Sequence, residues 1–171
     1  MGLFSRIFKP ENRQLGIDKQ DFSYISEIAG LITENDSGFM KMLNDFLIYT
    51  QNECEKEDRD FEYWTGMVDE LEEEGYLISV DYKCELEDFL WALSQIKNYS
   101  IIESAVSGLE FDESSDAEEW GRKINLALNG EAYVCMIDID SDSYELIIAA
   151  ADVYKEIKSI AEADGHSIKA F

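Results

Sequence analysis

Hydrophobic residues recur every three or four positions in six stretches of the chain, and this spacing predicts six amphipathic helices. These helices are expected at residues 22–32, 37–47, 61–74, 86–96, 116–128 and 153–164. Four shorter stretches, rich in β-branched and aromatic residues, predict strands at 76–82, 132–139, 144–149 and 168–171. A polar run at 140–143 joins the second and third of these strands as a β-hairpin.

Residues at the expected helix ends support these bounds. Asp36 or Ser37 begins the second helix, because short side chains with an oxygen satisfy free backbone amides there. Ser115 and Glu118 form a capping box before the fifth helix, and Gly75 ends the third in a left-handed conformation. Strands do not alternate strictly with helices. The sequence therefore predicts an α+β fold, with a small, mainly antiparallel sheet and a late β-hairpin packed against about six helices.

The 171 residues are 46% hydrophobic, which suits one domain with a core of its own. Residues 1–20 differ from the rest, since they hold four basic and two acidic residues and alternate apolar with basic side chains. The chain is thus divided into a basic amphipathic N-terminal arm, 1–20, and a single acidic α+β domain, 21–171. Two interpretations of the arm stay open: a peripheral anchor to a membrane or partner, or a segment that packs on the domain or frays.

Charge is the strongest functional signal. Asp and Glu number 38 against 14 Lys and Arg, so the formal net charge is −24. Such a field repels nucleic acid and attracts basic protein surfaces. Two blocks are densest in acid, residues 53–74 and 110–119. The candidate partner-binding residues are acids of these blocks and two tyrosines beside acidic residues: Glu70, Glu72, Glu73, Glu74, Asp112, Glu113, Asp116, Glu118, Glu119, Tyr82 and Tyr144. The alternative is a solvated face that only keeps the protein in solution.

No catalytic or cofactor signature accompanies the charge. The glycines form no phosphate-binding loop, and His166, the single histidine, excludes sites with two histidine ligands. We interpret His166 as a surface or strand-edge side chain. Three widely spaced cysteines predict free thiols in a reducing cytoplasm. We therefore expect no enzyme, no cofactor and no nucleic-acid partner. The longest apolar run, 146–151, is too short to span a membrane.

Three aspartates in the hairpin, Asp138, Asp140 and Asp142, match the first ligands of a calcium loop. The glycine and glutamate that such a loop requires later are Ser143 and Ala149 here. We therefore interpret the stretch as a solvated turn, with weak divalent binding left open.

Four further residues are interpreted as part of the core. Trp64, Trp91 and Trp120 lie in stretches with helical hydrophobic spacing, so core packing is expected for each. Cys135 lies within an apolar strand and is expected to be a small buried residue.

Two local patterns resemble a known family. Asp81-Tyr82-Lys83 precedes a Leu-Glu-Asp-Phe-Leu-Trp run that starts at Leu86, and a late Asp-Ser-Tyr sequence closes the hairpin at Tyr144. Together they resemble an uncharacterised bacterial domain family of small acidic α+β proteins, over about residues 20–171, with Tyr82 in place of the family's Trp. Such domains resemble toxin-immunity proteins.

This resemblance implies a cytoplasmic bacterial immunity protein that neutralises a cationic toxin by occluding its basic surface. The alternative is a regulatory or adaptor domain docked through its N-terminal arm to a membrane or a larger protein.

Overall fold

A computed structural model describes residues 22–171, so the predicted arm at 1–20 lies outside the described residues. Its helices are α1 (Ser23–Ile32), α2 (Ser37–Glu53), α3 (Arg59–Glu73), α4 (Leu86–Gln95), the 3₁₀ helix η1 (Lys97–Ile101), α5 (Glu103–Ser107), α6 (Ala117–Ala127) and α7 (Ala151–Ala163). Its strands are β1 (Ile78–Asp81), β2 (Ala132–Asp138), β3 (Ser143–Ala150) and β4 (Ser167–Ala170). The expected α+β fold is confirmed, including the late hairpin.

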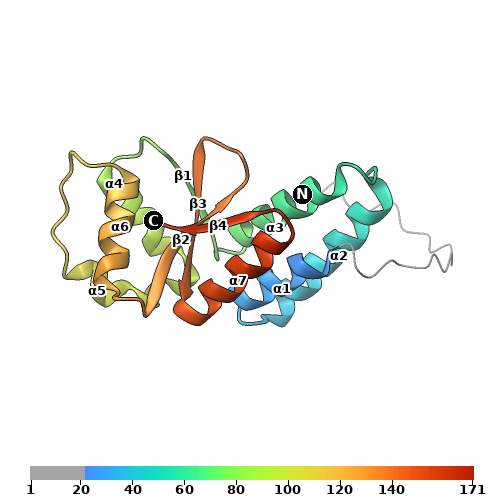
Figure 1. The fold of residues 1–171 in the computed structure, drawn as a ribbon, viewed down its shortest axis with the longest axis horizontal. Helices are drawn as coiled ribbons and strands as arrows, with labels where there is room; N and C mark the ends of the chain where they lie inside the picture. The colour runs from blue at the N-terminus through green and yellow to red at the C-terminus, as the bar shows by residue number, and fades with distance from the viewer. Residues whose placement is uncertain (1–21) are drawn as a thin grey trace, which may run out of the picture.

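The four strands form one sheet in the order β1-β3-β2-β4, and every neighbouring pair is antiparallel. In the hairpin Cys135 lies opposite Ile147. Strands β1 and β4 form the two edges, although they are far apart in sequence (Figure 1). The central pair is therefore the hairpin that the sequence predicted.

Helices cover both faces of the sheet. Cys135 and Ile147 belong to one hydrophobic cluster, with side chains of α1, α2, α3 and α7. Val134 and Ile148 belong to the other, with side chains of α4, α5 and α6. Because successive strand residues point to opposite faces, the sheet separates the two clusters. Figure 1 shows the resulting three layers, with the sheet between the two groups of helices.

Capping residues and a left-handed glycine explain where α2 begins and where α3 ends. Asp36 caps α2 by accepting hydrogen bonds from two backbone amides. Gly75, with φ of +73°, ends α3, and the Tyr76 amide donates to the carbonyl of Leu71 at 2.8 Å. Tyr76 thus belongs to this turn, so β1 begins at Ile78, later than expected.

Two further expectations are wrong in detail. The cap of α6 is Asp116, which accepts from the Glu119 amide at 2.9 Å, one residue beyond the capping box expected at Ser115. Trp91 is 60% exposed rather than buried, because α4 turns Phe89 and Leu93 toward the core and Trp91 lies on its other side.

The other core expectations are confirmed. Trp64 and Trp120 are each 2% exposed, and Cys135 is fully buried. Within residues 22–171, no helix combines the length and the apolar character needed to cross a bilayer.

Candidate functional site

The sheet topology gathers several chain segments at one end of the sheet. Asp81, the last residue of β1, pairs with Ser143, the first residue of β3. Asp138, at the end of β2, pairs with Ser167, at the start of β4. We call this the hairpin end of the sheet, because the β2–β3 turn also lies there. In Figure 1 this turn lies between the β1–α4 connection and the α7–β4 turn.

An acidic groove lies beside the hairpin end, on the face covered by α4 and α6. One part has a volume of about 490 Å³, and its lining includes Tyr82, Tyr144 and Asp116. The other part has about 500 Å³ and lies along the start of α4. Both parts are lined by Glu85 and Glu113, so they adjoin, and we call them together the acidic groove.

The lining of the acidic groove is strongly negative. Its carboxylates are Glu85, Glu87, Glu113, Asp116 and Glu118, and the only basic residue among the lining residues of its two parts is Lys83. All five acidic residues are exposed. A cation that enters the groove therefore meets several carboxylates without having to displace buried ion pairs.

Aromatic side chains, including Trp120 and Tyr144, form the floor of the groove. The Tyr144 hydroxyl donates to Glu118 Oε1 at 3.3 Å, and burial together with the charge of Glu118 raises the pKa of this phenol. The ring of Tyr144 packs edge-on against Phe171. Trp120 donates its indole N–H to the carbonyl of Asp112 at 2.8 Å, which fixes the loop before α6. These contacts hold the groove's aromatic floor in place.

Only some of the candidate partner-binding residues predicted from the sequence line the acidic groove. Tyr82, Tyr144, Glu113, Asp116 and Glu118 line the acidic groove. Asp112 and Glu119 are exposed nearby in the chain but are absent from the groove lining. The carboxylate of Asp112 accepts hydrogen bonds from the amide and hydroxyl of Ser114, and these bonds lower its pKa.

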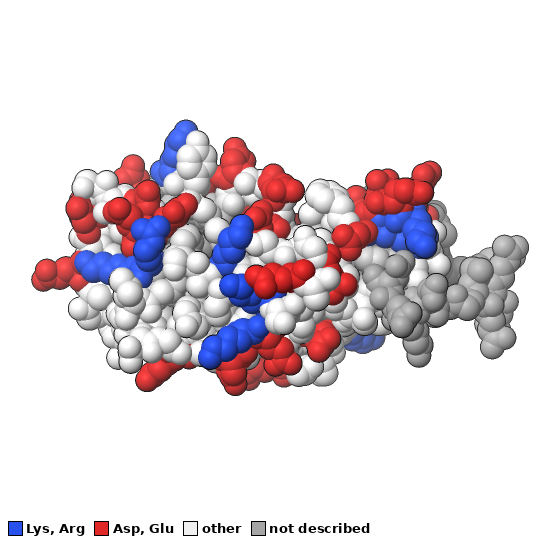
Figure 2. Space-filling model, viewed as in Figure 1, with Lys and Arg blue, Asp and Glu red and all other residues white. Residues whose placement is uncertain are grey.

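The four glutamates at the end of α3 lie elsewhere. Helix α3 leads into β1, so its last residues lie near the start of β1, at the opposite end of the sheet from the groove. Glu72 accepts from the Ser79 amide at 3.2 Å, and Glu74 pairs with Lys97 at 3.6 Å. Burial, followed by the charge of Glu73, raises the pKa of Glu70. The two acidic blocks therefore do not form one patch, and Figure 2 shows carboxylates in several separate regions.

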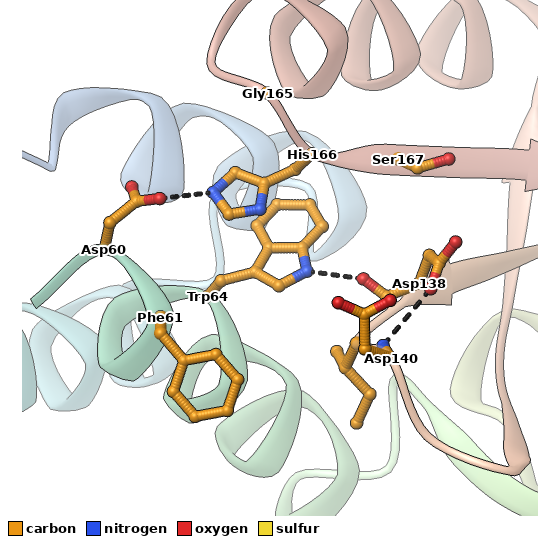
Figure 3. Close-up of a pocket in the computed structure, with 9 residues that line it drawn as sticks. Asp60, Phe61, Trp64, Asp138, Asp140, Gly165, His166 and Ser167 are labelled. Carbon is orange, nitrogen blue, oxygen red and sulfur yellow. Dashed lines mark hydrogen bonds and ion pairs between the residues drawn. The ribbon is translucent and has the colours of Figure 1, made fainter. Parts of the chain in front are cut away.

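A second hollow lies at the hairpin end on the opposite face of the sheet. It has a volume of about 240 Å³, and its lining includes Asp60, Phe61, Trp64, Asp140 and His166. We call it the His166 hollow. Figure 3 shows the His166 ring lying over the Trp64 indole, with the Asp60 carboxylate beside the histidine.

The imidazole of His166 is held from several directions. Its ring stacks on Trp64 with centroids 4.1 Å apart and planes 8° apart. Its Nε2 lies 3.3 Å from Asp60 Oδ2 and 3.1 Å from the Tyr24 hydroxyl. The Tyr24 hydroxyl also donates to Asp60 Oδ1 at 2.6 Å, and the pKa of Tyr24 is raised by burial and by this carboxylate. Helices α1 and α3 are thereby joined to the start of β4.

Local sequence explains part of this arrangement. Gly165, with φ of +87°, ends α7, and the His166 amide donates to the carbonyl of Ala161 at 2.9 Å. Asp60 and Trp64 are four residues apart on α3 and therefore lie on one side of that helix. The sequence analysis interpreted His166 as a surface or strand-edge side chain. The helix-ending glycine before it was a usable signal, but the contact with Tyr24, 142 residues away, follows only from the tertiary fold.

The hairpin aspartates form no metal centre. Asp138 pairs with Lys169 at 3.1 Å and accepts from the Asp140 amide at 3.2 Å; the bond to Lys169 and then the bond to that amide lower its pKa. Among residues 22–171, no group of three or more histidine, cysteine or acidic side chains is placed to hold a metal ion.

Fold and site together define an α+β domain with helices on both faces of an antiparallel sheet and an acidic, aromatic-floored groove at the hairpin end. A family model described as Domain of unknown function (DUF6630) matches residues 25–171, and the chain belongs to this family. The expected membership of an uncharacterised domain family is thereby confirmed. No curated protein and no solved structure matches the chain significantly.

Proposed function

We propose that this domain is a non-enzymatic acidic binding protein whose groove receives a basic segment of a partner protein. The supporting observation is the acidic groove itself, where Glu85, Glu113, Asp116 and Glu118 surround an aromatic floor. A guanidinium group suits such a lining, because it pairs with carboxylates through two hydrogen bonds and stacks on aromatic rings. In its specific form, the protein is a bacterial cytoplasmic immunity protein that neutralises a cationic toxin by covering its basic surface.

Electrostatics favours this use of the groove. The net charge of −24 produces a long-range attraction for any basic surface, and attraction of this kind raises association rates by about 10- to 1,000-fold at low salt. Long-range charge alone does not select a site. We infer that the groove provides the selection, because Tyr82 is 43% exposed and lies among its carboxylates.

Charge reversal in the groove tests the proposal. The double variant Glu85→Lys/Glu113→Lys changes two exposed residues that line both parts of the groove. A matched control, Glu73→Lys/Glu119→Lys, makes the same change in net charge at exposed residues that do not line it. Stopped-flow association with a fluorescent octa-arginine peptide is measured between low and moderate salt. We expect the groove variant to slow association about tenfold and to flatten its salt dependence, and the control to change it by less than about twofold.

Equal slowing by both double variants would show that net charge, and not the groove, governs binding. The immunity form has a separate test, in which the protein is co-expressed with the product of a neighbouring toxin-like reading frame. We expect the wild type and the control variant to restore growth and the groove variant to fail. Restoration by all three proteins would refute the groove as the inhibitory surface.

A further inference from the structure

The acidic groove and the His166 hollow lie at the same end of the sheet and have similar linings. Both lie at the hairpin end of the sheet, one on each side of the β2–β3 turn. The His166 hollow is lined by Phe61, which is 60% exposed, and the acidic groove by Tyr82, which is 43% exposed. Each hollow therefore offers an accessible aromatic ring among carboxylates.

A buried tryptophan also lines each hollow and ties it to the neighbouring backbone. Trp64 donates its indole N–H to the carbonyl of Asp138, and Trp120 donates to the carbonyl of Asp112, both at 2.8 Å. These bonds hold loop backbone in position beside each hollow. Preformed sites of this kind lose little conformational entropy when they bind.

Three carboxylates, Asp60, Asp138 and Asp140, line the His166 hollow, and its lining residues include no lysine or arginine. Lys169 pairs with Asp138, whereas Asp60 and Asp140 are both exposed. Asp60 is held in place by the Tyr24 hydroxyl and by His166, so its carboxylate is already positioned. The volume of about 240 Å³ suits one long side chain rather than a whole peptide. A single arginine side chain, with its planar cation, matches the ring of Phe61 and these two carboxylates.

We infer that the hairpin end is one interaction surface, on which a single basic partner places one arginine side chain in the acidic groove and a second in the His166 hollow. This inference rests on the proposed function and adds the second contact and its spacing. From β4 to β1 the sheet end spans three strand spacings, about 14 Å, and the hollows lie on opposite faces, so the two side chains enter about 15–25 Å apart.

Bivalent peptides test the spacing. Peptides with two arginines joined by Gly-Ser spacers of 1, 8, 16 and 40 residues are compared with a single-arginine peptide. Flexible spacers of about 8 to 16 residues have average lengths of about 15–24 Å. We expect these two peptides to bind at least about fivefold tighter than the shortest peptide, with weaker binding again at 40 residues.

The indole N–H signals in nuclear magnetic resonance spectra report each hollow separately. Trp64 lines the His166 hollow and Trp120 lines the groove, whereas Trp91 is 60% exposed, lines neither and serves as an internal control. With the peptides whose spacers have 8 and 16 residues, the Trp64 and Trp120 signals should shift together. The variant Phe61→Ala should abolish the spacer dependence and the Trp64 shift but keep the Trp120 shift. Trp91→Ala is the matched control, with an equally exposed ring outside both hollows.

The possible outcomes separate the two proposals. Shifts confined to Trp120 with every peptide would overturn the second contact and leave the groove proposal standing. Shifts at both tryptophans with no spacer dependence would show two independent sites and would also overturn the inference. No shift at either tryptophan would overturn both proposals.

Discussion

Asn125 on α6 joins that helix to the sheet at the point where β4 ends. Its Oδ1 accepts from the Val134 amide at 2.7 Å, and its Nδ2 donates to the Val134 carbonyl at 2.9 Å and to the Phe171 carbonyl at 3.4 Å. The last pair between β2 and β4 is Cys135 with Ala170, so Val134 lies one residue beyond the pairing. The amide of Asn125 thus takes the place of a missing strand neighbour.

The substitution Asn125→Leu keeps a similar volume but leaves the Val134 amide and carbonyl without their side-chain partner. Asn125 is only 9% exposed, so water does not readily replace it. Each unsatisfied buried backbone group costs about 1–3 kcal/mol, and the added apolar burial offsets part of this. We expect a loss of about 2–4 kcal/mol in the free energy of unfolding, measured by urea denaturation with tryptophan fluorescence.

The variant Asn125→Asp separates hydrogen bonding from packing. It retains the acceptor for the Val134 amide but, when ionised, places a carboxylate against the Val134 carbonyl. Protonation restores an O–H donor, so this variant should regain stability relative to wild type as the pH falls through the raised pKa of the new carboxyl group. A loss below about 0.5 kcal/mol for Asn125→Leu, or no pH-dependent recovery for Asn125→Asp, would refute this account.

Three further predictions concern exposed and half-buried residues. Lys169→Gln should lower stability at pH 7 by about 0.5 kcal/mol. Because the ion pair lowers the pKa of Asp138, that contribution is lost as the pH falls through the lowered value. Acid titration of both proteins should show their stabilities converging once the pH lies below that value. Glu70→Gln should raise the urea midpoint, by about 0.5 kcal/mol in stability, because it removes a partly buried charge and its repulsion by Glu73. An unchanged midpoint at low salt would contradict this. Trp91→Ser should change stability by less than about 0.5 kcal/mol, whereas Trp120→Ala should cost about 3–5 kcal/mol, as measured by thermal unfolding.

The fold was largely predictable because its signals are local. Hydrophobic spacing located the six longer helices but not the short η1 and α5, and Gly75 and Gly165 marked two of the helix ends. Trp91 was misplaced because an aromatic residue within a helical pattern reveals its face only when neighbouring helices are known. The short β1 was over-extended because Tyr76 has strand-like chemistry but completes the turn after α3.

The candidate site was predictable only in part. Acidic density nominated Glu113, Asp116 and Glu118, and the structure brings them together with Tyr82 and Tyr144. The glutamates at the far end of α3 are equally dense in acid but lie elsewhere, because composition contains no information on which ends of elements meet. The contacts of His166 were not predictable for the same reason, since its partners come from α1 and α3.

The separation of the apolar interior into two clusters gives each half of the molecule its own optical probe. Trp64 belongs to one cluster and Trp120 to the other. Replacing Trp91 with phenylalanine would remove the solvent-exposed background, and each remaining indole could then be silenced in turn. Unfolding transitions that differ between the two probes would identify halves that melt as distinct cooperative units, and coincident transitions would identify a single one.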